Sequence, residues 1–441
     1  MTPKYRFSEF SDEICPKSLS SYLIVNPDRN KDLTYSKDDV LSVSGELGVV
    51  NQIELLGRSY AGESVAEYHI VGNNDIVYTK SPLKANPYGI VKCNKGKTGI
   101  VSTLYAVYHC KGNTNPHFVD YYFAYDNRLN RYLKPLVRIG AKHDMKIGNE
   151  EVLVGTVGFP SLYEQQKIAD FLTAYDEKVS LQQQKVDALE KRKKGLLQKV
   201  FSQEIRFKAD DGSEFQEWEE KCFADFSVQT GKRNKDKIRY DIYAITNKNG
   251  FISQAEAHDE FAYMKDADIS AYNIVSPYSF GYNPARINVG SIGYYEGENN
   301  VLVSSLYEIF QTNEQIIARF LLYWFKTSIF QKWVEKLQEG SVRLYFYYDK
   351  LCECRIAIPC LEEQQKIADF FSAIDEQIGL EKQRLEAMQT VKKGLLQQMF
   401  CDGSEAEEEE HTGAAAIYQL HPQASTLQAA QPDVEYNRSG Q

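Results

Sequence analysis

The sequence contains no long hydrophobic segment. No apolar run in its 441 residues approaches the ~20 residues that a membrane-spanning helix needs, and Met1 to Glu13 has no signal-peptide core. The eight cysteines are scattered, and Cys352, Cys354 and Cys360 lack the spacing of a zinc site. Because Cys352 and Cys354 alternate like one face of a strand, we interpret them as small core residues. These absences favour a cytoplasmic protein with reduced thiols.

Signatures of catalysis are also missing. Gly96-Lys97-Thr98 resembles the end of a phosphate-binding loop, but Val91 stands where the first glycine of that loop should be. Asn86-Pro87-Tyr88 and Asn283-Pro284-Ala285 lack the second proline of an amino-methyltransferase motif, and we interpret both as turns. The seven histidines form no metal or triad spacing. We therefore expect no catalytic residue, no metal site and no cofactor in this chain.

Basic residues are not in excess. The formal net charge is −10, but residues 402–441 hold eight acidic residues and one basic residue, Arg438. Without them, 50 basic residues face 53 acidic ones, a net charge of −3. Residues 401–441 have no hydrophobic periodicity, which predicts a disordered acidic tail. The near-neutral body predicts weak non-specific affinity for nucleic acid, so phosphate binding must come from local patches or a partner.

What the chain does have is an internal repeat. Residues 160–201 and 359–400 align without a gap at an offset of 199 and are identical at 23 of 42 positions. Both copies contain Glu-Gln-Gln-Lys-Ile-Ala-Asp-Phe, starting at Glu164 and at Glu363, and both end in Lys-Lys-Gly-Leu-Leu-Gln. The repeat indicates two similar halves, each a globular region followed by a long helix. We expect an approximate twofold axis and a function performed twice.

Each copy reads as one continuous helix. Both are rich in helix-forming Gln, Glu, Lys, Leu and Ala and contain no proline after Pro160 or Pro359. A helix of about 38 residues is roughly 57 Å long at ~1.5 Å per residue. The alternative, a buried helix in an ordinary α domain, would need more than the single apolar stripe that each copy carries.

The apolar stripe predicts a coiled coil, because its residues alternate at spacings of four and three. The first helix would pair through Ile168, Leu172, Tyr175, Val179, Gln182, Val186, Leu189, Lys193, Leu196 and Val200. The second would pair through Ile367, Phe371, Ile374, Ile378, Glu381, Leu385, Met388, Lys392, Leu395 and Met399. Polar residues interrupt both stripes at matching layers, which fixes the register. We expect an antiparallel pair with the globular regions at opposite ends.

The two globular regions share short segments and differ between them. Arg29-Asn30-Lys31-Asp32 recurs as Arg233-Asn234-Lys235-Asp236, and Tyr68-His69-Ile70-Val71 resembles Tyr272-Asn273-Ile274-Val275. Short runs of Tyr, Val, Ile and Thr, separated by Gly, Asn and Pro, indicate many short strands. An amphipathic helix is expected at 314–337, with a counterpart at 117–133. The fold class is therefore α+β, with two strand-rich mixed domains joined by two long helices in an antiparallel coiled coil and a pseudo-twofold internal repeat.

Local clusters of basic and polar residues are candidates for DNA contact. They follow equivalent strands and helices in the two regions. The candidates are Lys80, Ser81, Lys84, Arg138, Lys142, His143, Lys232, Arg233, Lys235, Tyr282, Asn283, Arg286 and Arg343. Arg, Asn and Lys can reach base edges or neutralise phosphates. The alternative for any one of them is a charge or polar group on a solvated loop.

The arrangement of variable domain, repeated helix, second variable domain and second repeated helix closely resembles the specificity subunit of type I restriction-modification systems. The resemblance covers residues 1–401, and its most specific part is the paired motif at 160–171 and 359–370. It implies target recognition domains at 1–159 and 217–358, spacer helices at 160–201 and 359–400, and a linker at 202–216. The acidic tail departs from the family pattern.

The resemblance also implies how such a chain works. Each domain would read one half of a bipartite site in double-stranded DNA, while the helices set the spacer and dock two methyltransferase subunits. Two restriction and translocase subunits would join in the full complex. S-adenosylmethionine, ATP and Mg would belong to those partners only, and this chain would be a non-catalytic subunit. The alternatives are a coiled-coil interaction protein without a DNA role, and a methyltransferase or nuclease in its own right.

Overall fold

The computed structural model describes residues 3–83, 85–139, 145–253 and 269–400. Three candidate DNA contacts, Lys84, Lys142 and His143, lie outside these residues, as does the tail predicted at 401–441. The chain divides into two compact units. The first contains Met1–Gln182 and the chain from Gln383 onward, and the second contains Gln183–Lys382. Each unit holds one globular region and half of each long helix; the predicted boundaries of the recognition domains and linker stay predictions.

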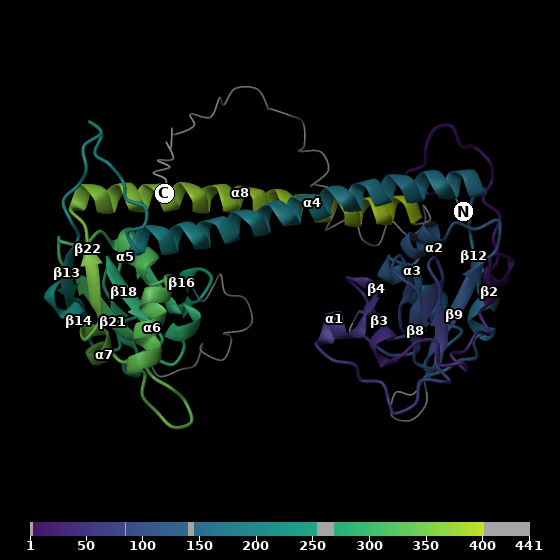
Figure 1. Ribbon diagram of the computed structural model, residues 1–441, viewed down its shortest axis with the longest axis horizontal. Coiled ribbons are helices and arrows are strands. Elements are labelled where there is room, and N and C mark those ends of the chain that lie inside the picture. Colours follow the sequence, from purple (N-terminus) through teal and green to yellow (C-terminus); the bar gives the residue numbers. More distant parts are fainter. Residues whose placement is uncertain (1–2, 84, 140–144, 254–268, 401–441) are drawn as a thin grey trace, which may run out of the picture. The chain divides into compact units, whose positions relative to one another are not determined.

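The first unit is built from short strands and helices in the order that follows (Figure 1). They are β1 (Lys17–Ser18), η1 (Leu19–Ser21), β2 (Leu23–Val25), η2 (Lys37–Asp39), β3 (Leu41–Ser44), β4 (Gly48–Asn51), α1 (Gln52–Leu56), β5 (His69–Val71), β6 (Ile76–Thr79), β7 (Val91–Cys93), β8 (Gly99–Val101), β9 (Tyr105–Cys110), α2 (Pro116–Tyr122), α3 (Asp126–Leu133), β10 (Arg138–Ile139), β11 (Met145–Lys146), η4 (Glu151–Val154) and β12 (Thr156–Val157). Antiparallel strands β2, β9, β6 and β7 form the main sheet in that order.

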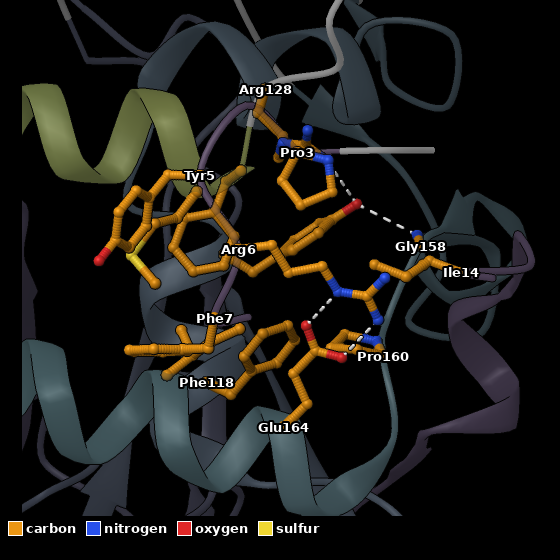
Figure 2. Close-up of a pocket in the computed structure, with 14 residues that line it drawn as sticks. Pro3, Tyr5, Arg6, Phe7, Ile14, Phe118, Arg128, Gly158, Pro160 and Glu164 are labelled. Carbon is orange, nitrogen blue, oxygen red and sulfur yellow. Dashed lines mark hydrogen bonds and ion pairs between the residues drawn. The ribbon is translucent and has the colours of Figure 1, made fainter. Parts of the chain in front are cut away.

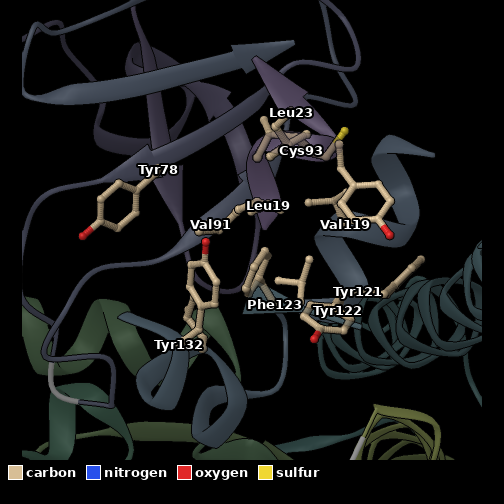
Figure 3. Packing of buried hydrophobic residues seen from close by; sticks show 14 of the residues in the cluster. Leu19, Leu23, Tyr78, Val91, Cys93, Val119, Tyr121, Tyr122, Phe123 and Tyr132 are labelled. Carbon is tan, nitrogen blue, oxygen red and sulfur yellow. The ribbon is translucent and has the colours of Figure 1, made fainter. Parts of the chain in front are cut away.

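Strand β6 shows how the layers are built. Side chains along a strand point alternately to the two faces of its sheet. Ile76 and Tyr78 join the large core that includes residues of α2 and α3, whereas Val77 joins a smaller cluster with residues of β3, β4 and β5. All four residues of β6 are buried because both faces of the sheet are covered. Figure 3 shows Tyr78 and Val91 of the sheet together with Val119 and Phe123 from the α2 region, all members of this core.

The second unit repeats this plan. Its elements are β13 (Glu219–Cys222), η5 (Phe223–Asp225), β14 (Ser227–Thr230), β15 (Tyr243–Thr246), β16 (Gly250–Ser253), η7 (Ile269–Ala271), β17 (Asn273–Val275), β18 (Ser279–Tyr282), η8 (Ile287–Val289), β19 (Ile292–Tyr295), β20 (Val301–Val303), β21 (Glu308–Thr312), α5 (Ala318–Trp324), α6 (Ser328–Leu337), α7 (Tyr348–Cys352) and β22 (Arg355–Ile358). Its main sheet has the order β14-β21-β18-β19, which matches β2-β9-β6-β7 strand for strand. The α+β class and the internal repeat are therefore confirmed.

Three local expectations are wrong. The helix expected at 314–337 is broken into α5 and α6, because Thr327 accepts a hydrogen bond from the amide of Phe330 and so caps a new helix. The counterpart at 117–133 is likewise two helices, α2 and α3. Cys352 ends helix α7 and is half-buried, so only the fully buried Cys354 behaves as the expected core residue.

The long helices are α4 (Leu162–Phe201) and α8 (Leu361–Phe400), each of 40 residues. In the first unit the Tyr175 hydroxyl donates to the carbonyl oxygen of Met388 at 3.1 Å. In the second unit Lys185 pairs with Glu381 at 2.5 Å, and Lys193 pairs with Asp375. As numbers rise along α4 they fall along α8, so the two helices run antiparallel in each unit.

The long helices also complete the core of each globular region. The first core includes Leu396, Met399 and Phe400 from the end of α8, beside Ile168 and Leu172 from the start of α4. The second core includes the end of α4 and the start of α8 in the same way. Each globular region is therefore packed against both helices.

Candidate sites for domain anchoring, helix pairing and DNA contact

The repeated motif anchors the first globular region to α4. Glu164 is only 2% exposed, and its carboxylate accepts hydrogen bonds of 2.7 Å from both Nε and Nη2 of Arg6 (Figure 2). The hydrogen bond to Glu164 raises the pKa of Arg6. A two-pronged arginine–carboxylate pair satisfies a buried charge and fixes its direction. Glu164 also lies in the first turn of α4, where the helix dipole favours an anion.

The second unit contains the same pair. Arg206 donates from Nε and Nη2 to Glu363 at 3.3 and 3.0 Å, and Glu363 is fully buried. The indole N–H of Trp218 adds a third hydrogen bond, 3.0 Å to Oε2 of Glu363. The hydrogen bond to Glu363 raises the pKa of Arg206. Both buried carboxylates are thus held by an arginine more than 150 residues away in the sequence.

The first glutamine of each motif copy is also buried. Gln165 accepts from the amide of Asn115 at 2.9 Å and donates to the carbonyl of Pro160 at 2.9 Å. Gln364 accepts from the amide of Ile317 at 2.8 Å and donates to the carbonyl of Pro359 at 3.0 Å. Each side chain links the entry of a long helix to the N-terminus of a short helix. Because the partners are backbone atoms, the link does not depend on the side chain at that point of the domain.

A second junction joins the first globular region to both long helices. Asp176 of α4 accepts from the hydroxyl of Tyr121 at 2.9 Å and pairs with Lys392 of α8 at 2.6 Å. Tyr121 also lies 3.3 Å from the Thr173 hydroxyl. Burial raises the pKa of Tyr121, so the hydroxyl keeps the proton that it donates.

The equivalent residues meet in the second unit. Asp375 accepts from the Tyr323 hydroxyl at 2.9 Å and pairs with Lys193, and Ser372 replaces the threonine at 3.4 Å. Lys193 and Lys392 are two of the polar residues that interrupt the apolar stripes of the predicted coiled coil. Each of them is satisfied by an aspartate on the facing helix, and that aspartate also accepts a hydrogen bond from a tyrosine of the globular region.

The apolar helix-pairing candidates fall into two groups. Those that are buried are Ile168, Leu172, Val186, Ile367, Phe371, Ile378 and Leu385. Those that are half-buried are Val179, Leu189, Leu196, Ile374 and Leu395. Near the C-terminal end of each long helix, the residue after the candidate is more buried than the candidate itself: Leu197 is more buried than Leu196, and Leu396 more than Leu395. The helix packs there on a globular core as well.

The candidates for DNA contact are scattered over several loops, and Tyr282 is a correction. Its side chain is fully buried in the second core, with its ring 6.4 Å from that of Phe310, so it cannot contact DNA in this structure. The neighbouring Asn283 is half-buried, and its side-chain oxygen accepts from the amide of Ala285. Tyr282 is the last residue of β18, whose four residues are all buried, and it precedes the loop that carries the exposed Arg286.

Two basic candidates have partners within their own units. Lys80 is half-buried and donates to the side-chain oxygen of Asn149 at 2.7 Å, and burial lowers its pKa. Arg233 is exposed, but its guanidinium donates to the carbonyl of Ala271 at 2.6 Å. Arg29 makes the same bond to Glu67 at 2.8 Å in the first unit. The shared bond indicates that Arg233 supports its loop.

The other described candidates are free. They are exposed, and their side chains make no hydrogen bond or ion pair with any residue that the structure describes. They are Ser81, Arg138, Lys232, Lys235, Arg286 and Arg343. They remain available to phosphates or base edges.

Residues that sequence analysis left without a role include Arg6, Arg206, Asp176 and Asp375. All four lie in segments that recur at an offset of 199 or 200, so the repeat could have identified them as candidates. Their partners could not be read from it, because they come from distant parts of the chain. Among the described residues no three His, Cys, Asp or Glu side chains are grouped as a metal site, and no helix is long and apolar enough to cross a membrane.

This architecture matches a known family. The model of the type I restriction modification DNA specificity domain matches residues 59–191 and 216–390, well over half of the chain. The chain therefore belongs to the family of type I restriction-modification specificity subunits. Its role is to give DNA sequence specificity, and it is not a catalytic subunit.

Relatives agree with this assignment. The type I restriction enzyme MjaVIII specificity subunit of Methanocaldococcus jannaschii is 24% identical over 351 residues, 74% of this chain and 78% of its own length. The HindI specificity subunit of Haemophilus influenzae is 22% identical over 191 residues, 42% of this chain and 41% of its own. The crystal structure of a type I S subunit from M. genitalium shares the fold, with a TM-score of 0.51, 14% identity and coverage of 91% of this chain and all of that one.

Proposed function

We propose that each unit reads one half of a bipartite, asymmetric site in double-stranded DNA, and that α4 and α8 set the spacer between the halves. The observation that carries this proposal is the duplication. The same anchors, Arg6–Glu164 and Arg206–Glu363, hold two copies of one scaffold whose exposed loops differ. One scaffold with two different sets of loops is suited to reading two different half-sites.

We also propose that two methyltransferase subunits dock on the long helices. Leu181 of α4 and Leu380 of α8 are 64% and 61% exposed and stand at equivalent positions of the repeat. Exposed leucines at matching positions offer each helix one apolar contact that a partner could cover. Two equivalent positions fit two copies of one partner.

The chemistry then belongs to the partners. A methyltransferase must take an adenine out of the base stack to modify it, and it would supply S-adenosylmethionine. Two restriction and translocase subunits would supply ATP and Mg sites. The near-neutral charge of this chain without its tail, −3, fits a division of labour in which partners provide much of the phosphate clamp.

Mapping N6-methyladenine in cells with and without this gene, in the presence of its companion methyltransferase, tests the proposal. The expected result is gene-dependent methylation of a motif with two unequal halves and a fixed spacer. A continuous motif, or methylation that does not depend on the gene, would rule it out. Insertion of seven residues at matching places in both long helices should add roughly 10 Å, about three base pairs, to the spacer.

A further inference from the structure

A closed hairpin projects from the second unit between α6 and α7 (Figure 1). Glu339 and Tyr345 exchange both backbone hydrogen bonds at 2.8 Å, which closes the loop between them. Gly340 has a φ of 132°, and a Cβ at this position would lie 2.0 Å from the carbonyl oxygen of Arg343. Only glycine can therefore close the loop in this way.

The base of the hairpin is tied to the core. Phe346 is fully buried, its ring lies 6.0 Å from that of Phe330, and its amide donates to the carbonyl of Pro284 at 3.0 Å. The Glu339 carboxylate pairs with Lys350 at 2.9 Å. The backbone is thus held at the base, while the residues from Ser341 to Leu344 extend outward.

The tip combines an apolar side chain with a free cation. Val342 is 95% exposed, the most exposed large hydrophobic residue among those described. Arg343 beside it is exposed and makes no hydrogen bond or ion pair with the described part of the chain. No acidic residue occurs between Gly340 and Tyr348, and the nearby Glu339 is already paired. Because Val342 is exposed and Arg343 has no partner in the described part of the chain, both side chains are available to a ligand.

The bond between Phe346 and Pro284 brings a second free cation to the same region. Arg286 follows Pro284 by two residues, is exposed and has no partner among the described side chains. An unpaired arginine at the apolar tip and a second one near the base of the hairpin are complementary to a polyanion that also presents apolar groups. A DNA groove offers both, with phosphates along its rim and thymine methyl groups on its floor.

We propose that this hairpin is the base-reading element of the second unit. Arg343 would donate to O6 and N7 of a guanine, Val342 would contact the methyl group of a neighbouring thymine, and Arg286 would neutralise a phosphate. A two-stranded hairpin fits the major groove, which is about 12 Å wide and is where guanine and thymine present these groups. The proposal rests on the DNA-recognition function proposed above.

The test uses the full chain with its companion methyltransferase. Methylation is measured at the mapped site and at all single-base variants of it, for Arg343→Lys, Arg343→Ala and Val342→Ala. Arg343→Ala should lower discrimination at one G·C pair of one half-site by about 5- to 150-fold. Arg343→Lys keeps the charge but replaces the rigid planar fork with a flexible ammonium group, so it should lower that discrimination by a smaller factor. Val342→Ala should weaken discrimination at an adjacent T·A pair, by about a few-fold. The other half-site should not change.

Matched controls separate the roles. Val228→Ala removes the same atoms from another exposed valine of this unit, on β14, and should leave both half-sites unchanged. Arg286→Ala should weaken binding of the mapped duplex without changing base preference and reduce the slope of log affinity against log salt by about one. Unchanged melting of each variant confirms that the fold is intact.

The outcomes are distinct. If the wild-type protein directs no bipartite methylation, the proposed function fails. If it does, but Arg343→Lys behaves like wild type while Arg343→Ala lowers methylation at all sites equally, Arg343 contacts phosphate and the base-reading proposal is overturned. It is equally overturned if Val342→Ala and both Arg343 variants leave both half-sites as they were.

Discussion

In the first unit Arg29 donates to the carbonyl of Glu67, and in the second Arg233 donates to that of Ala271. The strand β6 is followed by Lys80, which is bonded to Asn149, whereas the matching strand β18 is followed by Asn283, which caps its own turn. Bonds that both units share build the scaffold. Residues that differ at the same place, such as Lys80 and Asn283, are not part of that shared scaffold. The comparison therefore separates the bonds of the common scaffold from those found in one unit only.

The largest effect should come from the buried carboxylates. Glu164→Ala leaves Arg6 without its partner, and the loss should lower the stability of the first unit by about 3–5 kcal/mol. Glu363→Ala should cost the second unit more, because Trp218 also loses its acceptor. Hydrogen exchange followed in β6 and β18 measures the two units separately. Equal losses in both units would mean that the indole bond contributes nothing.

Acid should weaken the first unit more than the second. Burial, aided by the charges of Arg29 and Lys80, lowers the pKa of His69 to about 4. An unfolded histidine has a pKa near 6.5, so the unfolded chain takes up the proton first, and stability falls as the pH drops from about 6.5 to 4. The loss should reach about 3 kcal/mol.

The second unit has Asn273 at the position of His69, where its side chain donates to the carbonyl of Tyr307 at 2.9 Å. His69→Asn should therefore reduce the acid sensitivity of the first unit, as followed by hydrogen exchange between pH 4 and 7. His117, whose pKa burial also lowers, should account for the part that remains. If the variant is as sensitive to acid as the wild type, the buried histidine is not the cause.

Substitution of the exposed leucines tests whether the two units bind a methyltransferase subunit with equal affinity. Leu181→Arg and Leu380→Arg should each weaken binding of one methyltransferase subunit by about 1–2 kcal/mol, roughly 5- to 30-fold, without changing melting. Titration with mass measurement of the complexes should show loss of one subunit in each single variant and of both in the double variant. Ala174→Arg, on an exposed alanine of α4 one heptad away, shows how far the contact extends. Full assembly of the double variant would contradict the docking proposal.

The smallest expected effect concerns the tyrosines at the helix junctions. Tyr121→Phe and Tyr323→Phe each remove one hydrogen bond to an aspartate, and each should cost about 1 kcal/mol. Since both bonds are 2.9 Å long, the losses measured in the two units should agree closely. Unequal losses would show that the junctions differ in strength despite their matching geometry.

Much of the architecture could be predicted from the repeat. The helical composition and spacing predicted α4 and α8, and the strand-rich composition predicted the α+β class. The partner of Glu164 could not be predicted, because Arg6 lies 158 residues away and nothing local specifies the pair. The break at Thr327 was missed because the apolar pattern continues across it, while the cap depends on one hydroxyl. Tyr282 was misplaced because all four residues of β18 are buried, and nothing in the sequence marks where the buried strand gives way to the exposed loop.

The sharing of long helices between the units has a consequence for synthesis on the ribosome. The core of the first unit includes Leu396, Met399 and Phe400, which are among the last described residues to be made. The core of the second unit needs nothing beyond the first part of α8. The globular region that is synthesised first therefore keeps part of its core uncovered until after all residues of the second core have been made. The first unit is thus translated first but completed last. Its nascent form is the species most prone to aggregate or to bind a chaperone.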